Sequence, residues 1–181
     1  MKGDAKLGKV MGRAAANELK KHFRKLNSER ANKLGGKRSN FYSHVAASVQ
    51  NPKTTENKII VAISHPHIAQ RFWGGTIRPT KTKLIAVPVN KKGYGVYPRI
   101  YSSVLAFLPT RRGGVLVEGE EVVITRGKNA GKKRRVPKKG GALIYALVEK
   151  ISQKKDPSVM PKDQVIIGAM ERGLKLIRPG E

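Results

Sequence analysis

The residues VLVEGEEVVI, at Val115–Ile124, lie in the middle of the chain and are central to its fold. Val115–Val117 and Glu121–Ile124 are short runs rich in β-branched residues, and Glu118–Glu120, with a central glycine, separates them. Short β-branched runs divided by a glycine-containing turn predict two antiparallel strands joined as a hairpin. The middle of the chain is therefore expected to form an antiparallel sheet.

The segments around this hairpin also have strand character. They are β-branched or apolar runs bounded by proline, glycine or charged residues. Further strands are predicted at Lys58–Ile63, at Leu84–Val87, where Pro88 is expected to end the strand, and at Ala142–Ile151. Arg99–Leu108 is compatible with either a helix or a strand.

The N-terminal segment has the period of an amphipathic helix. Its apolar residues Met11, Ala15, Leu19, Phe23 and Leu26 recur every three or four positions. The predicted helix runs from about Lys6 to Lys33 and ends at Leu34–Gly36, since glycine commonly terminates helices. The opposite side of this helix is basic, with Lys20, Lys21, Arg24 and Lys25. Residues 1–35 are thus a basic N-terminal helix or arm. We interpret it as a core-packing helix with a solvated basic side, and the alternative is a helix that lies on DNA or a membrane.

Helical signals occur at two other places. Asn40 is placed to cap a short helix over Phe41–Val49. Asp156–Pro157 starts a turn, and a final helix is expected to open at Pro161. The apolar stripe of that final helix consists of Ile166, Ala169 or Met170, Gly173 or Leu174, and Ile177. The order of helices, strands and a last helix predicts one α+β domain over residues 1–181, with a mainly antiparallel central sheet.

The charge of the chain is its most informative bulk property. The 181 residues contain 38 Lys and Arg against 12 Asp and Glu, which gives a formal net charge of +26. Such an excess destabilises a compact state unless a polyanion or an acidic partner offsets it. Nucleic acid is the most common polyanion, and its binding is strongly salt-dependent.

Other bulk features exclude several classes of site. The chain has no cysteine, which rules out disulfides, zinc knuckles and thiol chemistry. No apolar run is long enough to cross a bilayer, so no membrane association through a span is expected. The N-terminus lacks the apolar core of a secretory signal, and we expect the chain to be unprocessed.

A second basic segment occupies Arg126–Lys139 and contains no acidic residue. Predicted strands on both sides make it a long hairpin loop, and its glycines and like charges predict mobility in the free protein. It has no aromatic residue for base stacking, so it is expected to contact phosphates or an acidic protein surface. The candidate contact residues are Arg126, Lys128, Lys132, Lys133, Arg134, Arg135, Lys138 and Lys139.

The stretch Ser64–Val89 contains residues that could form a metal-binding or phosphate-binding site. His65 and His67 would share one face of a strand, but two histidines without a nearby carboxylate are a weak metal signal, and we expect no metal. The glycine pair Gly74–Gly75 fits no phosphate-binding motif. It predicts a tight turn with positive φ, with Phe72 or Trp73 packed beneath it.

Nothing in the chain indicates catalysis. Acidic residues are few and scattered, and the Ser–His neighbours at Ser43–His44 and Ser64–His65 lack a nucleophile motif. We expect no enzymatic activity and no cofactor.

Three segments together resemble the virion-morphogenesis proteins of tailed bacteriophages, the tail-completion, neck and minor-tail group. They are Leu34–Tyr42, Arg71–Pro79 and Lys83–Pro88. A Gly-Gly-Thr-Ile-x-Pro start followed by Lys, Leu and a Pro-Val end is typical of that family. The matching residues here are Gly74, Gly75, Thr76, Ile77, Pro79, Lys83, Leu84, Pro88 and Val89. Leu147–Val148 and Asp156–Pro161 are similar to a later family segment.

The resemblance implies a structural, non-enzymatic protein of the head–tail junction or tail end. It implies a homo-oligomeric ring, a hexamer or similar, that contacts other neck or tail proteins and packaged DNA, made in the host cytoplasm and located in the virion. Phe72, Trp73, Gly74, Gly75, Ile77 and Pro79 would then form a structural turn or interface. The alternative is a basic nucleic-acid-binding protein, ribosome-associated or DNA-binding, which charge alone does not separate from the first interpretation.

Overall fold

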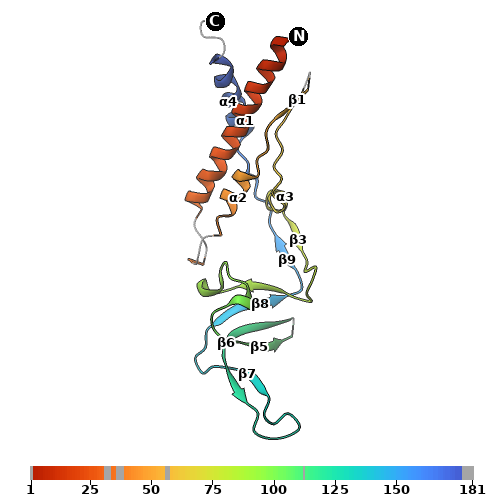
Figure 1. Cartoon of the computed structure of the whole chain (residues 1–181), viewed down its shortest axis with the longest axis vertical. Helices are drawn as coiled ribbons and strands as arrows, with labels where there is room; N and C mark the ends of the chain where they lie inside the picture. The colour runs from red at the N-terminus through yellow and green to blue at the C-terminus, as the bar shows by residue number, and fades with distance from the viewer. Residues whose placement is uncertain (1, 31–33, 36–38, 56–57, 112, 177–181) are drawn as a thin grey trace. The chain divides into compact units, whose positions relative to one another are not determined.

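A computed structural model describes residues 2–30, 34–35, 39–55, 58–111 and 113–176 (Figure 1). The fold is α+β, as predicted, with helices at both ends and an antiparallel sheet between them. The one domain expected from the sequence contains two compact units. Unit 1 comprises Met1–Arg30, Asn40–Gly75 and Gln153–Glu181, and unit 2 comprises Ala31–Ser39 and Thr76–Ser152.

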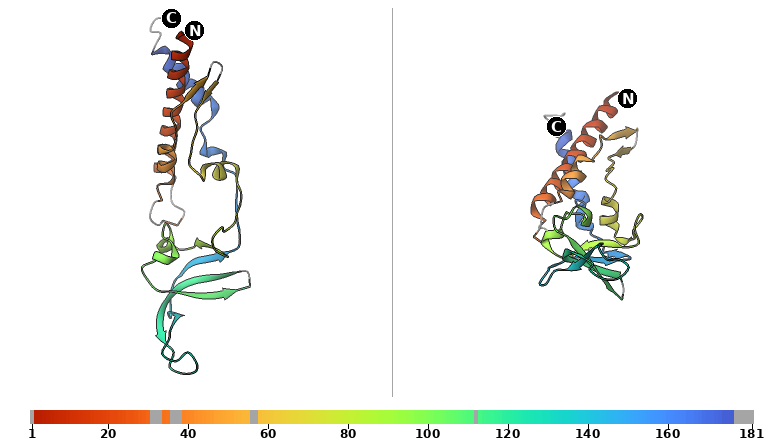
Figure 2. Two further views of the ribbon diagram at one scale, coloured as in Figure 1. Left: turned by 45° about the vertical axis from the view of Figure 1, so that its right-hand side comes forward. Right: turned by 60° about the horizontal axis from the view of Figure 1, so that its bottom comes forward.

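Three helices build the body of unit 1. Helix α1 (Lys2–Glu29) packs along α4 (Asp163–Lys175) and against α2 (Phe41–Ala47), and Figures 1 and 2 show α1 and α4 side by side. The predicted apolar stripe of α1 is confirmed, because Leu19 and Phe23 are buried. The expected packing of this helix in the core is therefore confirmed. The helix begins four residues earlier than predicted, and its predicted end at Lys33 lies outside the described residues, as do Gly36 and Ile177.

The core of unit 1 gathers side chains from five parts of the chain. Phe23 and Val45 are completely buried, as is Val159 of the short 3₁₀ turn η3 (Pro157–Val159). The buried cluster consists of Ala16, Leu19, Phe23, Tyr42, Val45, Ala46, Val49, Ile68 and Val159. Apolar side chains at helical spacing on α1 and α2 thus meet residues more than 100 positions away.

Shorter elements complete unit 1. Strands β1 (Lys53–Thr55) and β2 (Lys58–Ile60) pair antiparallel, and helix α3 (Ile68–Trp73) follows. The strand predicted to reach Ile63 is therefore shorter, since Ile63 forms only an isolated bridge with Val49.

The predicted N-cap residue of α2 is confirmed, but its side chain does not cap the helix, which ends at Ala47 and not at Val49. Asn40 does occupy the N-cap position, but its φ of 51° places it in the left-handed region and its side chain forms no cap hydrogen bond. Its main-chain carbonyl instead accepts a hydrogen bond from the His44 N–H at 3.0 Å.

Unit 2 is built on an antiparallel sheet in the order β4–β8–β6–β5. Its strands are β4 (Ile85–Pro88), β5 (Leu105–Thr110), β6 (Gly113–Val123), β7 (Lys133–Pro137), which pairs only with β6, and β8 (Leu143–Val148). Two 3₁₀ turns, η1 (Lys91–Gly93) and η2 (Pro98–Ile100), lie between β4 and β5. The segments that pass between the units, β3 (Gly75–Ile77) and β9 (Ile151–Gln153), pair with each other.

The hairpin predicted within Val115–Ile124 is wrong, because Val115–Val123 all belong to one strand. Strand β6 runs through Glu118–Gly119–Glu120 and pairs with β5 along its first half and with β7 along its second half. The Glu118 carboxylate accepts hydrogen bonds from Lys92 Nζ at 2.9 Å and Tyr101 Oη at 3.2 Å. These partners, led by Lys92, lower the pKa of Glu118 and keep a charged residue stable in the strand.

Two other strand predictions need correction. Pro88 is the last residue of β4, where it pairs with Tyr145, rather than a residue beyond the strand. This placement is compatible with proline because β4 is an edge strand. The strand predicted over Ala142–Ile151 is divided between β8 and β9. The ambiguous segment Arg99–Leu108 contains the end of η2 and the start of β5.

Within the described part of the chain, no helix is long and apolar enough to cross a membrane.

Candidate functional site

The β6–β7 hairpin carries the eight basic residues singled out in the sequence. All eight side chains are exposed. The predicted loop is shorter than Arg126–Lys139, because Lys133, Arg134 and Arg135 belong to strand β7 and pair with β6. In Figures 1 and 2 the two strands form a ribbon that leaves the rest of the sheet, with the connecting loop at its end. Three of the eight cations thus lie on β7, three lie in the connection before it, and Lys138 and Lys139 follow it.

The connection between β6 and β7 has internal hydrogen bonds. Ile124 N–H donates to the Lys132 carbonyl at 2.9 Å, and Gly131 N–H donates to the Ile124 carbonyl at 2.8 Å. Gly127 has a φ of 84°, which favours glycine, and Ala130 N–H donates to its carbonyl. The backbone of this connection therefore forms a hydrogen-bonded turn.

One carboxylate lies among the hairpin cations. Glu121 Oε2 is 3.5 Å from Lys133 Nζ, and Glu121 Oε1 is 3.6 Å from Arg135 Nε. Both pairs are solvent-exposed and weak. The other six cations of the hairpin form no ion pair with a described residue. The hairpin can therefore offer most of its charge to phosphates or acidic side chains.

The turn predicted at Gly74–Gly75 is confirmed in its backbone. The φ values are 76° at Gly74 and 125° at Gly75. Gly74 directly follows α3, and its N–H donates to the Gln70 carbonyl at 2.9 Å. A Cβ atom on Gly74 would lie 2.6 Å from the Lys155 nitrogen and 2.7 Å from the Gln153 oxygen. Glycine is required here because two backbone segments approach each other closely.

The aromatic residues beside this turn differ from each other in burial. Phe72 is half-buried, and its carbonyl accepts a hydrogen bond from the Asp156 N–H at 3.2 Å. Trp73 is 75 % exposed and meets the Phe72 ring edge-on at 4.7 Å. Of the two aromatic residues considered for packing beneath the turn, only Phe72 is partly buried. Ile77 is exposed and Pro79 is half-buried, so this segment presents apolar surface to solvent.

The two histidines of the His-Pro-His motif interact with each other. The His67 N–H donates to His65 Nδ1 at 3.3 Å, and the ring centroids are 6.0 Å apart. The His65 ring also meets Phe41 edge-on at 4.8 Å. Burial, followed by the charges of His67 and His44, lowers the pKa of His65. No group of three or more potential metal ligands occurs among the residues that the structure describes.

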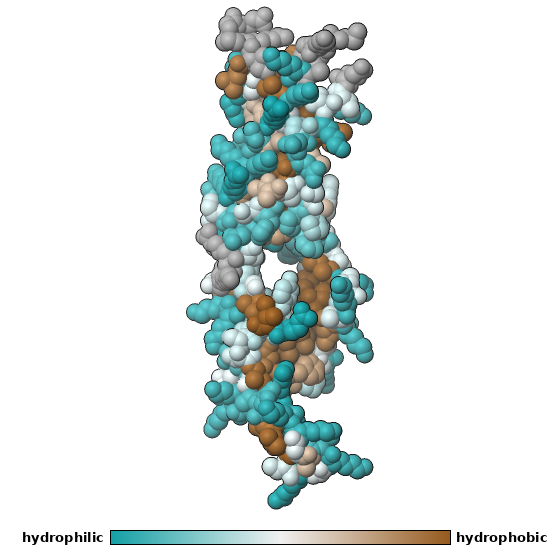
Figure 3. All heavy atoms as spheres, in the orientation of Figure 1, coloured by the Kyte–Doolittle hydropathy of each residue, from teal (hydrophilic) through white to brown (hydrophobic). Residues whose placement is uncertain are grey.

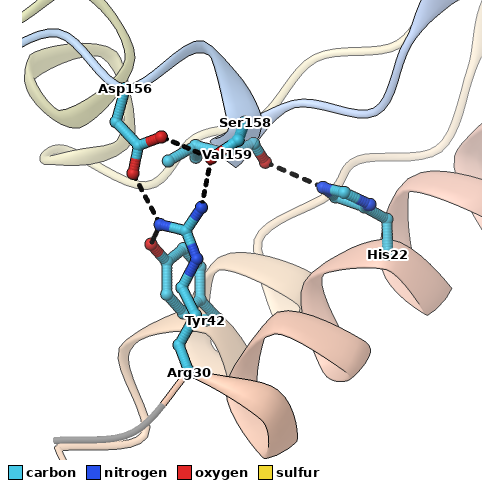
Figure 4. A network of polar contacts seen from close by, with 6 residues as sticks. All are labelled: His22, Arg30, Tyr42, Asp156, Ser158 and Val159. Atoms are coloured by element: carbon cyan, nitrogen blue, oxygen red, sulfur yellow. Dashed lines mark hydrogen bonds and ion pairs between the residues drawn. The ribbon is translucent and has the colours of Figure 1, made fainter.

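A polar network in unit 1 escaped the sequence analysis (Figure 4). The Arg30 guanidinium donates to Asp156 Oδ2, Tyr42 Oη and Ser158 Oγ, each at 2.6 Å. His22 Nε2 donates to the Val159 carbonyl at 3.1 Å. The network connects the end of α1 with α2 and η3. No local pattern predicts it, because Arg30 and Asp156 are 126 positions apart.

An apolar sheet face in unit 2 was also missed. Partners in register point to the same side of a sheet, so the pairing defines one face that is aliphatic except for the pair Thr110 and Gly113 at its end. We call it the aliphatic face, and its residues are Ile85, Val87, Ala106, Leu108, Val115, Val117, Leu143, Ala146 and Val148. Apart from Ala106, each keeps part of its surface exposed, and Leu108 and Leu143 are 37 % and 43 % exposed.

The opposite face of the same sheet is covered in part within unit 2, although Phe107, which is in register with Leu116 on that face, is 53 % exposed. Tyr145 lies on that face and is 1 % exposed, and its hydroxyl donates to the Val96 carbonyl at 2.8 Å. The Tyr101 ring lies edge-on to it at 6.1 Å. The segment between β4 and β5 therefore covers the sheet around Tyr145, and Figure 3 shows apolar residues gathered over this part of the molecule.

The two units differ in the number of apolar residues that they bury. Of the 14 buried apolar residues in the described chain, only Ala106, Ile144 and Tyr145 belong to unit 2. A unit of this size with so few buried side chains gains little stability from its own core. Covering the aliphatic face would add apolar burial at about 25 cal/mol per Å².

Comparisons with known proteins give no relative: no family model, curated protein or solved structure matches the chain.

Proposed function

We propose that this protein is a non-enzymatic structural protein that assembles with copies of itself. Its role is the one that the sequence resemblance implies, a ring at the head–tail junction or tail end of a tailed bacteriophage particle. The observation that carries the proposal is the aliphatic face of unit 2, together with the small core of that unit.

The charge distribution favours a second copy on the aliphatic face. At a net charge of +26, copies of this chain repel one another over most of their surface. The nine residues of the aliphatic face carry no charge, so two copies can approach there with the least repulsion. A ring requires a heterologous contact, because the same face packed against itself would close as a dimer. The aliphatic face of each copy would therefore pack on a different surface of its neighbour, and every copy in a closed ring would bury it.

The β6–β7 hairpin supplies the second part of the proposal. Repeated around a ring, its eight exposed cations would place positive charge toward packaged DNA or toward an acidic neighbouring ring. Modest contacts multiplied over several copies give high avidity.

Self-assembly is tested by measuring the molar mass of the full chain by light scattering, with electron micrographs of the same sample. We expect a mass of several chains and closed rings with a central opening. Leu108→Glu combined with Leu143→Glu should produce monomers, because charges would replace apolar contacts in the buried interface. A wild-type chain that stays monomeric at every concentration would refute the proposal.

A matched control is available on α4. Val165 and Ile167 are 43 % and 52 % exposed, similar to the two leucines of the aliphatic face. Val165→Glu combined with Ile167→Glu should leave the rings intact. If both double variants break the assembly, the effect is a general loss of apolar surface and the aliphatic face is not the interface.

A basic nucleic-acid-binding protein is the second candidate function. The exposed hairpin cations favour it. Tight binding of DNA or RNA by the monomeric Leu108→Glu/Leu143→Glu variant, with a steep salt dependence, would support this function without assembly.

A further inference from the structure

A second group of cations lies in unit 1, along one side of α1. Lys6, Lys9, Arg13, Lys20 and Arg24 are separated by three, four or seven positions. At 100° per residue these spacings place all five within an arc of about 60°, and they extend over about 27 Å of the helix axis. We call these five residues the α1 ridge.

The charges of the α1 ridge are available to a partner. Lys6, Lys9, Arg13 and Arg24 are exposed, and Lys20 is half-exposed. None of the five forms an ion pair with any residue in the part of the chain that the structure describes.

The acidic residues Glu18 and Glu29 of α1 lie away from the α1 ridge. Their helical positions are about 120° or more from every member of it. Glu18 lies 3.9 Å from Arg172 of α4, and Glu29 lies 3.7 Å from Lys25. The α1 ridge is therefore a strip of uncompensated positive charge with a defined direction.

The apolar side of α1 decides against a membrane surface. A helix binds in the bilayer interface by burying its apolar side among the lipid chains. In α1 that side is already occupied, since Leu19 and Phe23 are buried in the core of unit 1. What α1 presents outward is positive charge along one continuous helix.

We propose that the α1 ridge binds the phosphodiester backbone of duplex nucleic acid. Cations about 4.5 to 10.5 Å apart along a helix axis suit a linear row of phosphates, which carry one negative charge per about 3.4 Å of each strand. No aromatic side chain belongs to the α1 ridge, so it cannot stack on the bases of a single strand. Contact through phosphates alone is independent of base sequence. This inference concerns unit 1 and does not rest on assembly through unit 2.

The test measures the affinity of the full chain for duplex DNA of about 25 bp between about 50 and about 300 mM salt. The variant replaces Lys9, Arg13, Lys20 and Arg24 by Gln, which keeps high helix propensity. The slope of log affinity against log salt should decrease in magnitude by about 3.6, since each phosphate contact contributes about 0.9. For the double variant Lys9→Gln/Arg13→Gln, the slope should decrease in magnitude by about 1.8. This variant tests the proposal even if the quadruple variant does not fold.

The control variant removes the same number of positive charges from unit 2. Lys81, Lys83, Lys91 and Lys150 are exposed and lie outside both the α1 ridge and the β6–β7 hairpin. Their joint replacement by Gln should change the slope by less than about 1. Equal losses in the two quadruple variants would overturn the proposal, because binding would then follow net charge and not the α1 ridge. An absence of duplex binding by the wild-type chain at low salt would also overturn it.

Two other probes distinguish duplex nucleic acid from other polyanions as the ligand of the α1 ridge. The affinity for duplex RNA should depend on the α1 ridge as the affinity for duplex DNA does. Binding to vesicles with about one-third phosphatidylserine should not differ between the wild type and the α1 ridge variant. Binding to vesicles that is lost in the α1 ridge variant while duplex binding is retained would overturn the proposal in favour of a membrane. Assembly is read separately from the molar mass, so a failure here leaves the role of the aliphatic face open to its own test.

Discussion

Arg30 shows how one side chain connects distant parts of unit 1. It follows the last turn of α1, and its guanidinium donates to side chains of α2 and of the segment before α4. Its charge also lies 5.2 Å from the Tyr42 ring centroid. Charge-assisted hydrogen bonds are stronger than neutral ones, so this network orients the three elements around the core.

The Arg30 network makes stability depend on pH through Asp156. The hydrogen bond from Arg30, followed by that from Ser158, lowers the pKa of Asp156 below its usual value. A carboxyl with a lowered folded-state pKa stabilises the protein above its unfolded pKa, and the contribution is lost as pH falls through the folded-state pKa. Asp156→Asn should therefore cost about 1 kcal/mol in the free energy of unfolding at neutral pH, and the difference from wild type should shrink toward pH 2.

Urea unfolding at a series of pH values checks this expectation. Glu171→Gln is the matched control, because Glu171 lies exposed on α4 and forms no ion pair with a described residue. It should follow the wild-type pH dependence. A constant difference between Asp156→Asn and wild type at all pH values would contradict the ionic role of Asp156.

Gly74 is the residue whose replacement should be most costly at the turn after α3. Gly74→Val combines a φ of 76° with a Cβ 2.6 Å from the Lys155 nitrogen, and both are unfavourable. We expect a loss of about 2 to 4 kcal/mol in the free energy of unfolding. Thermal and urea unfolding measure it.

Gly127 provides the comparison for Gly74. Its φ of 84° is similar, but a Cβ there meets no atom within 4 Å. Gly127→Val should cost only the backbone strain, about 1 to 2 kcal/mol. If the two variants are equally stable, close packing at Gly74 is not the reason for its glycine.

At the scale of elements, β6 organises unit 2. Its first half lies between β5 and β8, and its second half continues beyond them to pair with β7. Glu118 and Gly119 signal a turn in the sequence, but in the structure Glu118 has three hydrogen-bonding partners and Gly119 lies against the Val136 carbonyl. Tertiary contacts thus override the local turn preference.

The β6–β7 hairpin should tolerate removal of charge without unfolding. Lys132, Lys133, Arg134 and Arg135 are exposed, and only two of them approach Glu121. Replacing all four by Ser should change the melting temperature by no more than about 4 °C, because exposed substitutions alter stability little. It should weaken the salt-dependent affinity for duplex DNA.

Circular dichroism and fluorescence anisotropy test the two halves of this prediction. Glu121→Gln is the complementary variant, since it removes the only acidic side chain that pairs with the hairpin cations among the described residues. Its affinity for the same duplex should increase. Unchanged affinity in both variants would remove the hairpin from the candidate binding surfaces.

At the scale of the whole molecule, charge repulsion opposes folding. Six ion pairs occur among the described residues, whereas the chain carries 38 basic side chains. Most positive charge is therefore uncompensated, and salt should relieve the repulsion by screening it. The melting temperature should rise by several degrees between about 20 mM and about 500 mM sodium chloride.

The variant with Lys81, Lys83, Lys91 and Lys150 replaced by Gln should show a smaller rise, because its net charge is lower. Differential scanning calorimetry of both chains measures this. A melting temperature that falls with salt would mean that the ion pairs outweigh the repulsion, contrary to their small number and exposure.

The sequence by itself determined the features that depend on neighbours in the chain. The apolar period around Leu19 and Phe23 predicted the buried side of α1, and the β-branched runs predicted the sheet. The backbone of Gly74–Gly75 and the exposure of the hairpin cations also followed from local composition. Such features are readable because helix and strand periods act over a few residues.

Only the tertiary structure decided which segments meet. It made Val115–Val123 part of one strand, joined Arg30 to Asp156, and left Trp73 exposed beside its turn. It also brought four strands into register so that nine aliphatic residues share one exposed face. The physical reason is that strand pairing and side-chain networks gain free energy from contacts between residues far apart in the chain, which no local pattern encodes.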